Sequence, residues 1–206
     1  MTIQGLQRAT RLVLMLFGFA VLAACAKPGV QAPDADVARF RYPGVQPSTL
    51  SLVTNIRNKT GKGAHSALIV NASEQVVFNP AGTWWHPQAP EQGDLHYGFS
   101  PGMKQWFIDY HARETFRVQI QTIEVSPEVA EQALELVKAY GSVPPSQCTI
   151  AISRILHQLP GFESISVTLF PSSAADAFGK LPGVVTEVYR DDSPDNRSDL
   201  GTFADG

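Results

Sequence analysis

The sequence predicts a single α+β domain over residues 49–190, in which an antiparallel sheet packs against about three helices. Two patterns in the chain carry this prediction. Short runs in which apolar and polar residues alternate, bounded by turn residues, are typical of half-buried antiparallel strands. Longer runs with apolar residues at helical spacing follow Ser-Pro pairs, which are typical of helix starts.

The first strands are predicted as a hairpin. Strand-like runs begin at Leu50, and residues 66–70 and 75–78 flank the segment 71–74, whose Asn-Ala-Ser-Glu sequence suits a turn. Residues 83–97 are rich in Trp, His and Pro and have no period. We therefore expect a loop there.

Three helices are predicted from their start signals and apolar spacing. Ser100 and Ser126 each precede a proline and suit the N-cap of the first two helices. Gly141 is the C-terminal stop of the second helix. A third helix is predicted to begin near residues 146–147 and to stop at Pro160.

Three further strands complete the predicted sheet. Residues 116–120 alternate between apolar and polar side chains, but after Thr122 the apolar parity slips. The slip predicts a bulge or the end of that strand. Alternation also predicts a strand over residues 165–169, and residues 184–189 form the last predicted strand.

The N-terminus has the order of regions found in a secretory signal. Arg8 and Arg11 precede the apolar residues 12–22, and small residues follow up to Cys25. The apolar run is too short for a bilayer core, which favours a signal peptide over residues 1–24. A plain signal peptide or an uncleaved anchor are the alternatives.

The Leu-Ala-Ala sequence before Cys25 resembles the lipobox of bacterial lipoproteins. The resemblance implies cleavage before Cys25 and lipidation of that residue, with a membrane as partner through the lipid anchor. Several acyl chains on one residue give lasting anchorage. Ala26 follows the cysteine, where an aspartate would be an inner-membrane retention signal. We therefore expect the periplasmic face of the outer membrane.

The two ends of the remaining chain are predicted to lie outside the domain. Residues 25–48 are rich in Pro, Gly, Ala and Gln and are predicted to form a lipidated flexible tether. Residues 191–206 are predicted to form a disordered acidic tail. Without Arg8 and Arg11 the chain has 14 basic and 19 acidic residues, a net charge of −5. With no basic stripe, this balance argues against a nucleic-acid partner.

Cys148 is the single thiol that remains once Cys25 is lipidated. It lies in the first turn of the third predicted helix, where free backbone N–H groups and the helix dipole favour a thiolate. A nucleophilic thiol needs an imidazole and a polar group that orients it. His65 begins one hairpin strand and Asn79 ends the next, so pairing of these strands would bring the amide beside the ring.

The sequence around these residues resembles two motifs of papain-like bacterial amidases. The segment 63–70 (GAHSALIV) is similar to their histidine strand, and 146–149 (SQCT) to their nucleophile turn. Because His65 precedes Cys148, the resemblance is to the circularly permuted branch, which includes lecithin–retinol-acyltransferase-like proteins. It implies a cysteine hydrolase of the amidase, peptidase or acyl-ester type, with Cys148 as nucleophile, His65 as base and Asn79 orienting the ring.

A catalytically silent envelope lipoprotein of the same fold, acting as a binding or scaffold module, is the main alternative. Cys148 would then be an inert buried thiol, His65 a strand-edge residue and Asn79 a turn residue, with residues 83–97 as the contact surface. A redox-sensing thiol without hydrolysis is a third interpretation. Trp84 and Trp85 are candidates for a substrate groove, or they cap an edge of the core.

No cofactor or metal is predicted. His96, His111 and His157 lack the paired spacing with acids or cysteines that zinc sites show. His111 lies with Asp109 and Arg113 at the end of a predicted helix, which favours a solvated or salt-bridged face.

Overall fold

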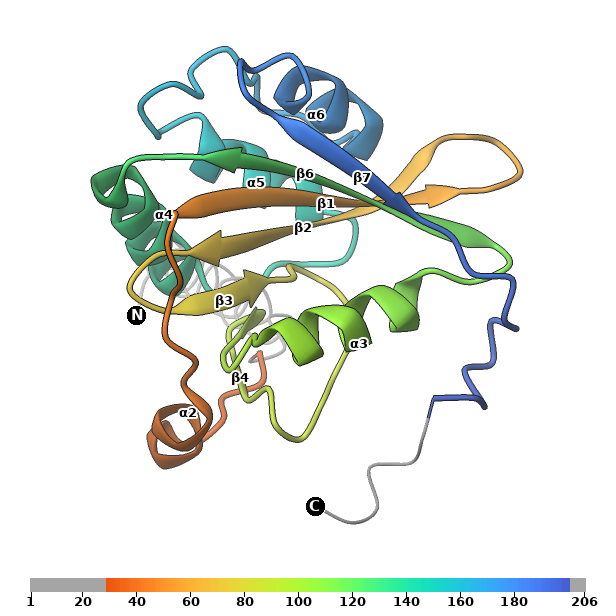
Figure 1. The fold of residues 1–206 in the computed structure, drawn as a ribbon, viewed down its shortest axis with the longest axis horizontal. Helices are drawn as coiled ribbons and strands as arrows, with labels where there is room; N and C mark the ends of the chain where they lie inside the picture. The colour runs from red at the N-terminus through yellow and green to blue at the C-terminus, as the bar shows by residue number, and fades with distance from the viewer. Residues whose placement is uncertain (1–28, 201–206) are drawn as a thin grey trace, which may run out of the picture.

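An antiparallel sheet forms the centre of the fold (Figure 1). The structure is a computed structural model that describes residues 29–200. Within these residues the sheet has seven strands in the order β4-β5-β3-β2-β1-β6-β7. The strands are β1 (Thr49–Arg57), β2 (Gly63–Asn71), β3 (Gln75–Phe78), β4 (Glu91–Gln92), β5 (Leu95–His96), β6 (Phe116–Glu124) and β7 (Val185–Tyr189).

The same described residues contain five helices, where about three were predicted. The helices are α2 (Asp34–Phe40), α3 (Pro101–His111), α4 (Pro127–Tyr140), α5 (Cys148–Leu156) and α6 (Pro171–Phe178). The predicted α+β class with an antiparallel sheet is confirmed, as is the hairpin formed by β2 and β3.

The predicted signal peptide and Cys25 lie outside the described residues. Over residues 29–200, none of the helices combines the length and the apolar character that crossing a bilayer requires.

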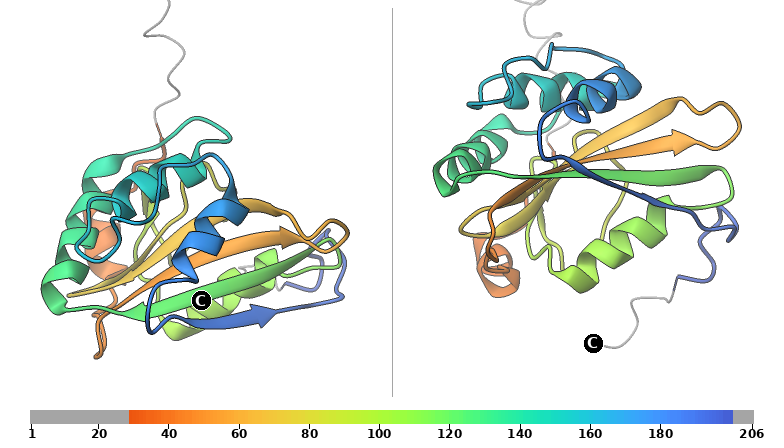
Figure 2. Two further views of the ribbon diagram at one scale, coloured as in Figure 1. Left: turned by 90° about the horizontal axis from the view of Figure 1, so that it is seen from above. Right: turned by 45° about the horizontal axis from the view of Figure 1, so that its top comes forward.

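Each face of the sheet is covered by a separate hydrophobic core. Helices α4, α5 and α6 lie on one side and α3 on the other (Figure 2). Along β1, Leu50 and Leu52 point into the core between the sheet and α4–α6. Val53 points into the core between the sheet and α3. Because both faces are buried, strand β2 holds the continuous apolar run 67–70.

The parity slip in β6 has its cause in these two cores. Val118 and Ile120 pack in the core under α3, whereas Ile123 packs against the core under α4–α6. The register with β1 is unbroken along the whole of β6, so the predicted bulge or strand end after Thr122 is wrong. The strand continues past Thr122, but its apolar side chains now point to the opposite face of the sheet.

The predicted helix caps are confirmed. The hydroxyl of Ser100 accepts the Met103 N–H at 3.2 Å, and that of Ser126 accepts the Val129 N–H at 3.4 Å. Gly141 follows α4 with φ of 76°, a left-handed conformation that favours glycine.

The strand predicted over residues 165–169 is wrong. This segment is irregular, with Ile165 buried and Leu169 53% exposed. Its backbone groups bond to side chains near and on α5 rather than to a strand. His157 Nδ1 donates to the Ile165 carbonyl at 3.0 Å, and the Thr168 N–H donates to Ser153 Oγ at 3.1 Å. The segment leads into α6, which the sequence analysis missed.

Residues 29–48 are folded onto the domain, so the prediction of a flexible tether over 25–48 is wrong for them; residues 25–28 lie outside the described chain. The Ala32 N–H donates to the Glu91 carbonyl at 2.8 Å, and Asn71 binds both backbone polar groups of Val45. Helix α2 buries no residue fully. Val37 of this helix packs against the core, but hydrogen bonds make most of the attachment. This explains why the segment shows no apolar period.

The predicted acidic tail is also partly folded. Residues 191–200 run along the domain, and 201–206 lie outside the described chain. Arg113 is 1% exposed, and its Nη1 donates to both carboxylate oxygens of Asp199 at 2.9 and 2.6 Å. The Arg197 guanidinium lies over the Tyr110 ring at 4.0 Å. Charge-assisted bonds to a buried arginine thus help to hold a segment that is mostly polar.

Trp84 and Trp85 have opposite environments. Trp84 is 2% exposed and packs edge-on against the rings of His96, Phe99 and Phe107, whereas Trp85 is 54% exposed. The prediction that Trp84 contacts substrate is therefore wrong, because its side chain is enclosed in the core. The loop predicted over 83–97 is also interrupted by the short strands β4 and β5.

We predict that Trp84→Ala destabilises the fold by about 3–5 kcal/mol, because it removes a large side chain from a closed core. Trp85→Ala is the matched control and is expected to cost about 1 kcal/mol or less. Urea unfolding followed by circular dichroism measures both. Equal destabilisation by the two variants would contradict the placement of Trp84.

Candidate active site

Three elements bring the predicted catalytic residues together (Figure 1). His65 is the third residue of β2, Asn79 directly follows β3, and Cys148 is the first residue of α5, which packs on β2. The β2–β3 register ends at the pair Leu68 and Phe78, so Asn79 leaves the ladder next to the strand that carries His65.

The side chains of His65 and Asn79 are hydrogen-bonded, with 2.7 Å between Nε2 and Oδ1. An amide oxygen can only accept, so Nε2 carries the proton and donates it. This bond sets the tautomer of the ring and leaves Nδ1 as the nitrogen available to the thiol. Asn79 is 1% exposed, and a Cβ on Gly82 would overlap its amide. The backbone of Gly82 therefore packs flat against the amide and holds it in place.

The Cys148 thiol and the His65 ring interact electrostatically, and their pKa values move toward each other. Burial opposes the thiolate, but the hydrogen bond and charge of His65 outweigh it and lower the pKa of the Cys148 thiol to about 7. Burial also opposes the imidazolium, yet the hydrogen bond and charge of Cys148 raise the pKa of His65 above 6.5. The charged thiolate–imidazolium form is therefore accessible near neutral pH.

Two groups besides His65 surround the sulfur. The backbone N–H of Ser66 donates to it and helps to lower the thiol pKa. Thr149 Oγ1 lies 3.7 Å from the sulfur and 3.2 Å from Ser66 Oγ. The thiol is 7% exposed. The sulfur is thus fixed at the helix start by strand β2 on one side and by its own helix on the other.

His111 lies at the site, which the sequence analysis did not predict. Its ring faces that of His65 at 6.4 Å between centroids, with 14° between the planes. Its Nδ1 donates to the Phe107 carbonyl at 2.8 Å, and burial lowers its pKa to about 3. The prediction of a solvated or salt-bridged face is wrong for His111, although Arg113 of that face is ion-paired with Asp199. His111 lies one helical turn after the buried Phe107, so helical spacing was the available signal.

Asp94 joins the chain segments that carry Asn79 and Cys148. Its Oδ2 accepts the Ala81 N–H at 2.8 Å and the Val143 N–H at 3.0 Å. Its carbonyl accepts the Asn79 N–H at 2.9 Å, and its charge helps to raise the pKa of His65. The turn after β3 and the loop before α5 are therefore held by one carboxylate.

No group of three or more metal-ligating side chains suited to an ion occurs within the described range 29–200. His96 is buried, which lowers its pKa to about 4 and keeps it neutral at physiological pH. His157 is bound to the Ile165 carbonyl, away from the other histidines in the fold.

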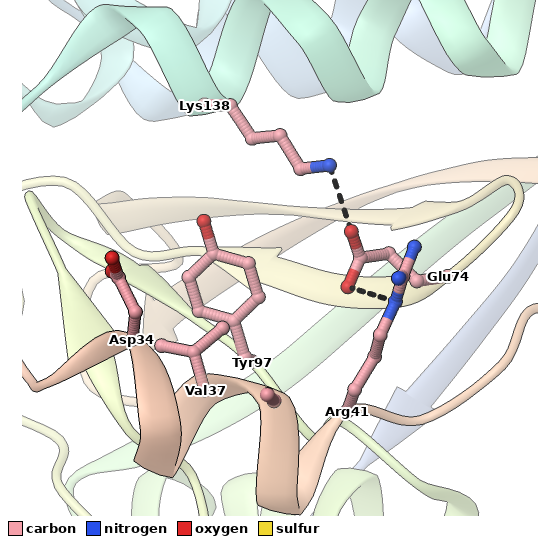
Figure 3. A pocket seen from close by; sticks show the side chains of 7 residues that line it. Asp34, Val37, Arg41, Glu74, Tyr97 and Lys138 are labelled. Atoms are coloured by element: carbon pink, nitrogen blue, oxygen red, sulfur yellow. Dashed lines mark ion pairs between the residues drawn. The ribbon is translucent and has the colours of Figure 1, made fainter.

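A cavity of about 440 Å³ lies elsewhere, between α2, α4 and the sheet (Figure 3). At its wall the buried carboxylate of Glu74 pairs with Lys138 Nζ at 2.7 Å and with Arg41 Nε at 3.3 Å. Because these charges neutralise one another and neither Cys148 nor His65 lines the cavity, we place the candidate active site at the thiol.

Comparisons with family models, with curated proteins and with solved structures found no match to this chain.

We predict that Asp94 keeps the thiol reactive by holding the two segments. Asp94→Gly removes both acceptors and tolerates the positive φ of 65° at this position. In this variant the pKa of the Cys148 thiol is expected to rise toward its ordinary value. The rise is measured as an alkaline shift in the pH profile of iodoacetamide alkylation. Asp94→Asn keeps an acceptor oxygen in a residue that also tolerates this φ, and is expected to shift the profile less.

The paired design separates hydrogen bonding from charge. If Asp94→Asn shifts the alkylation profile as far as Asp94→Gly, the charge on Asp94 and not its two acceptor contacts is responsible. A profile of Asp94→Gly identical to that of the parent protein would show that the carboxylate does not hold the site.

Proposed function

We propose that this protein is a lipid-anchored envelope hydrolase that uses Cys148 as its nucleophile, of the circularly permuted papain-like type. The observation that carries the proposal is the connected set in which Asn79 binds His65 Nε2, and His65 pairs with a thiol whose pKa is lowered to about 7. A buried structural cysteine has no need of this arrangement, and burial alone would raise its pKa.

The architecture supports the papain-like assignment. The nucleophile begins a helix that packs on a strand of the sheet, and that strand carries the histidine. The order of His65 before Cys148 along the chain suits the permuted branch. Asn79, as the third member, supplies a side-chain oxygen to the ring nitrogen that does not face the thiol.

The proposed reaction is acyl transfer to water through a thioester. The Cys148 thiolate attacks the acyl carbon of an amide or ester, and His65 donates its proton to the leaving amine or alcohol. His65 then takes a proton from water, which attacks the thioester and releases the acid and the thiol. The backbone N–H of Cys148 at the helix start is the first donor for the oxyanion. Cell-wall peptide amides, lipid acyl groups and isopeptide bonds all contain such a carbonyl.

The anchor is part of the same proposal. The sequence before Cys25 supports lipidation of that residue, and the absence of an aspartate after it supports the periplasmic face of the outer membrane. The membrane is then a permanent partner of the domain through the acyl chains.

The placement of Trp84 weakens the scaffold interpretation, since a side chain that is 2% exposed cannot form a contact surface. Trp85 remains as an exposed member of that loop. Labelling of the thiol separates the two interpretations most sharply, because a silent scaffold has no reason to keep an activated cysteine.

We predict that Cys148→Ala abolishes labelling by an acyloxymethyl ketone probe and hydrolysis of p-nitrophenyl acetate. His65→Ala is expected to lower both by about 10²–10⁴-fold, the range of general acid–base catalysis. Asn79→Ala should weaken them less, because it only orients the ring. His157→Ala changes an exposed histidine at the opposite end of α5 from Cys148; it is the matched control and should leave both unchanged. Undiminished labelling of Cys148 in His65→Ala would overturn the catalytic pair.

A further inference from the structure

The chain enters the described domain at a fixed place. The Gly93 N–H donates to the Val30 carbonyl at 3.0 Å, the Ala32 N–H to the Glu91 carbonyl at 2.8 Å, and Gln31 bridges to Gln92. Residues 30–32 thus pair with β4 and the turn after it. A swinging tether would have no such bonds.

That place lies beside the loop that leads into the nucleophile. Gly29 is in contact with Ser142, since a Cβ on Gly29 would overlap the serine side chain. Ser142 belongs to residues 141–147, which connect α4 to Cys148 at the start of α5. Asp94 binds the Val143 N–H in this loop at 3.0 Å. We call residues 29–31 together with 141–147 the entry surface.

The entry surface lies close to the predicted lipid attachment point. Only four peptide units separate Gly29 from Cys25, and even a fully extended chain would span about 14 Å over that length. A free tether reaching to Thr49 would span up to about 85 Å. The folding of residues 29–48 onto the domain therefore removes most of the reach that the sequence suggested.

The composition of the entry surface suits a membrane interface. Val30 is an apolar side chain that is 55% exposed, and Pro144, Pro145 and Ser146 are exposed in the loop that Gly29 contacts. No charged residue occurs among residues 29–31 or 141–147. The approach of this surface to lipid therefore carries no free-energy cost for removing water from a charged side chain.

We propose that the entry surface lies against the lipid bilayer that holds the Cys25 anchor, so that the Cys148 site works at the membrane surface. This inference rests on the lipid anchor of the proposed function. Strand β7 lies on the opposite side of the domain (Figure 2). With a radius of gyration of about 17 Å for a chain of this length, β7 then stands well away from the lipid.

The test uses full-length lipidated protein bound to vesicles of phosphatidylethanolamine and phosphatidylglycerol that contain a trace of rhodamine-labelled lipid. A donor dye is placed at Pro145→Cys or at Thr186→Cys, both exposed, in a Cys148→Ala background. Energy transfer to the rhodamine is expected to be at least about twofold more efficient from position 145, because the anchor is within about 14 Å of the entry surface.

A second variant carries a 30-residue Gly/Ser insertion between residues 28 and 29, which adds a flexible span of about 30 Å. Transfer from position 145 should fall in it to the level seen from position 186. Equal transfer from both positions before insertion overturns the proposal. A fall after insertion shows that the short linker holds the entry surface on the bilayer, and persistent transfer shows that the surface binds lipid by itself.

The anchor and the docking are tested separately. Radiolabelled palmitate should be incorporated into the parent protein and not into Cys25→Ser. If the parent is not acylated, the anchor itself is wrong and the docking proposal falls with it. If the parent is acylated and transfer is equal from both positions, only the docking is wrong. Labelling of Cys148 in the parent reports on the hydrolase independently of both results.

Discussion

Strand β2 is the element on which the candidate site depends, because it carries His65 and contacts the elements that carry Asn79 and Cys148. It pairs with β1 and β3 and supports α5, so its backbone position is fixed from both edges and from one face. His65 is carried on this strand, and the Ser66 N–H next to it contacts the sulfur. The pairing with β3 brings Asn79 to the ring, and the packing of α5 brings Cys148.

Burial disfavours the charged forms of Cys148 and His65, and the interaction between the two side chains offsets that cost. A thiolate and an imidazolium are both disfavoured in a desolvated site, and each is made accessible by the other. The neutral ring of His111 stacks against His65 without adding a competing charge. Asp94 adds a negative charge nearby and at the same time fixes the two segments that flank the pair. Reactivity and local rigidity therefore come from the same contacts.

The parts of the fold that were predictable from sequence are those specified by local signals. The caps at Ser100 and Ser126 and the hairpin that places Asn79 beside His65 depend on neighbours in the chain. The sequence could not show that Trp84 is enclosed or that residues 29–48 fold onto the domain, because both depend on contacts between distant segments. Asp94 was missed for the same reason, since its partners lie 13 and 49 residues away.

The most direct test of the account is an NMR titration of the His65 imidazole in the parent protein and in Cys148→Ala. The account predicts a His65 pKa above 6.5 in the parent, because the charge and hydrogen bond of Cys148, which raise this pKa, help to outweigh burial, which lowers it. In Cys148→Ala the burial remains while the support of the sulfur is lost, so the pKa of His65 should fall below its parent value. An identical His65 pKa in the two proteins would mean that thiol and imidazole do not interact, and would contradict the account.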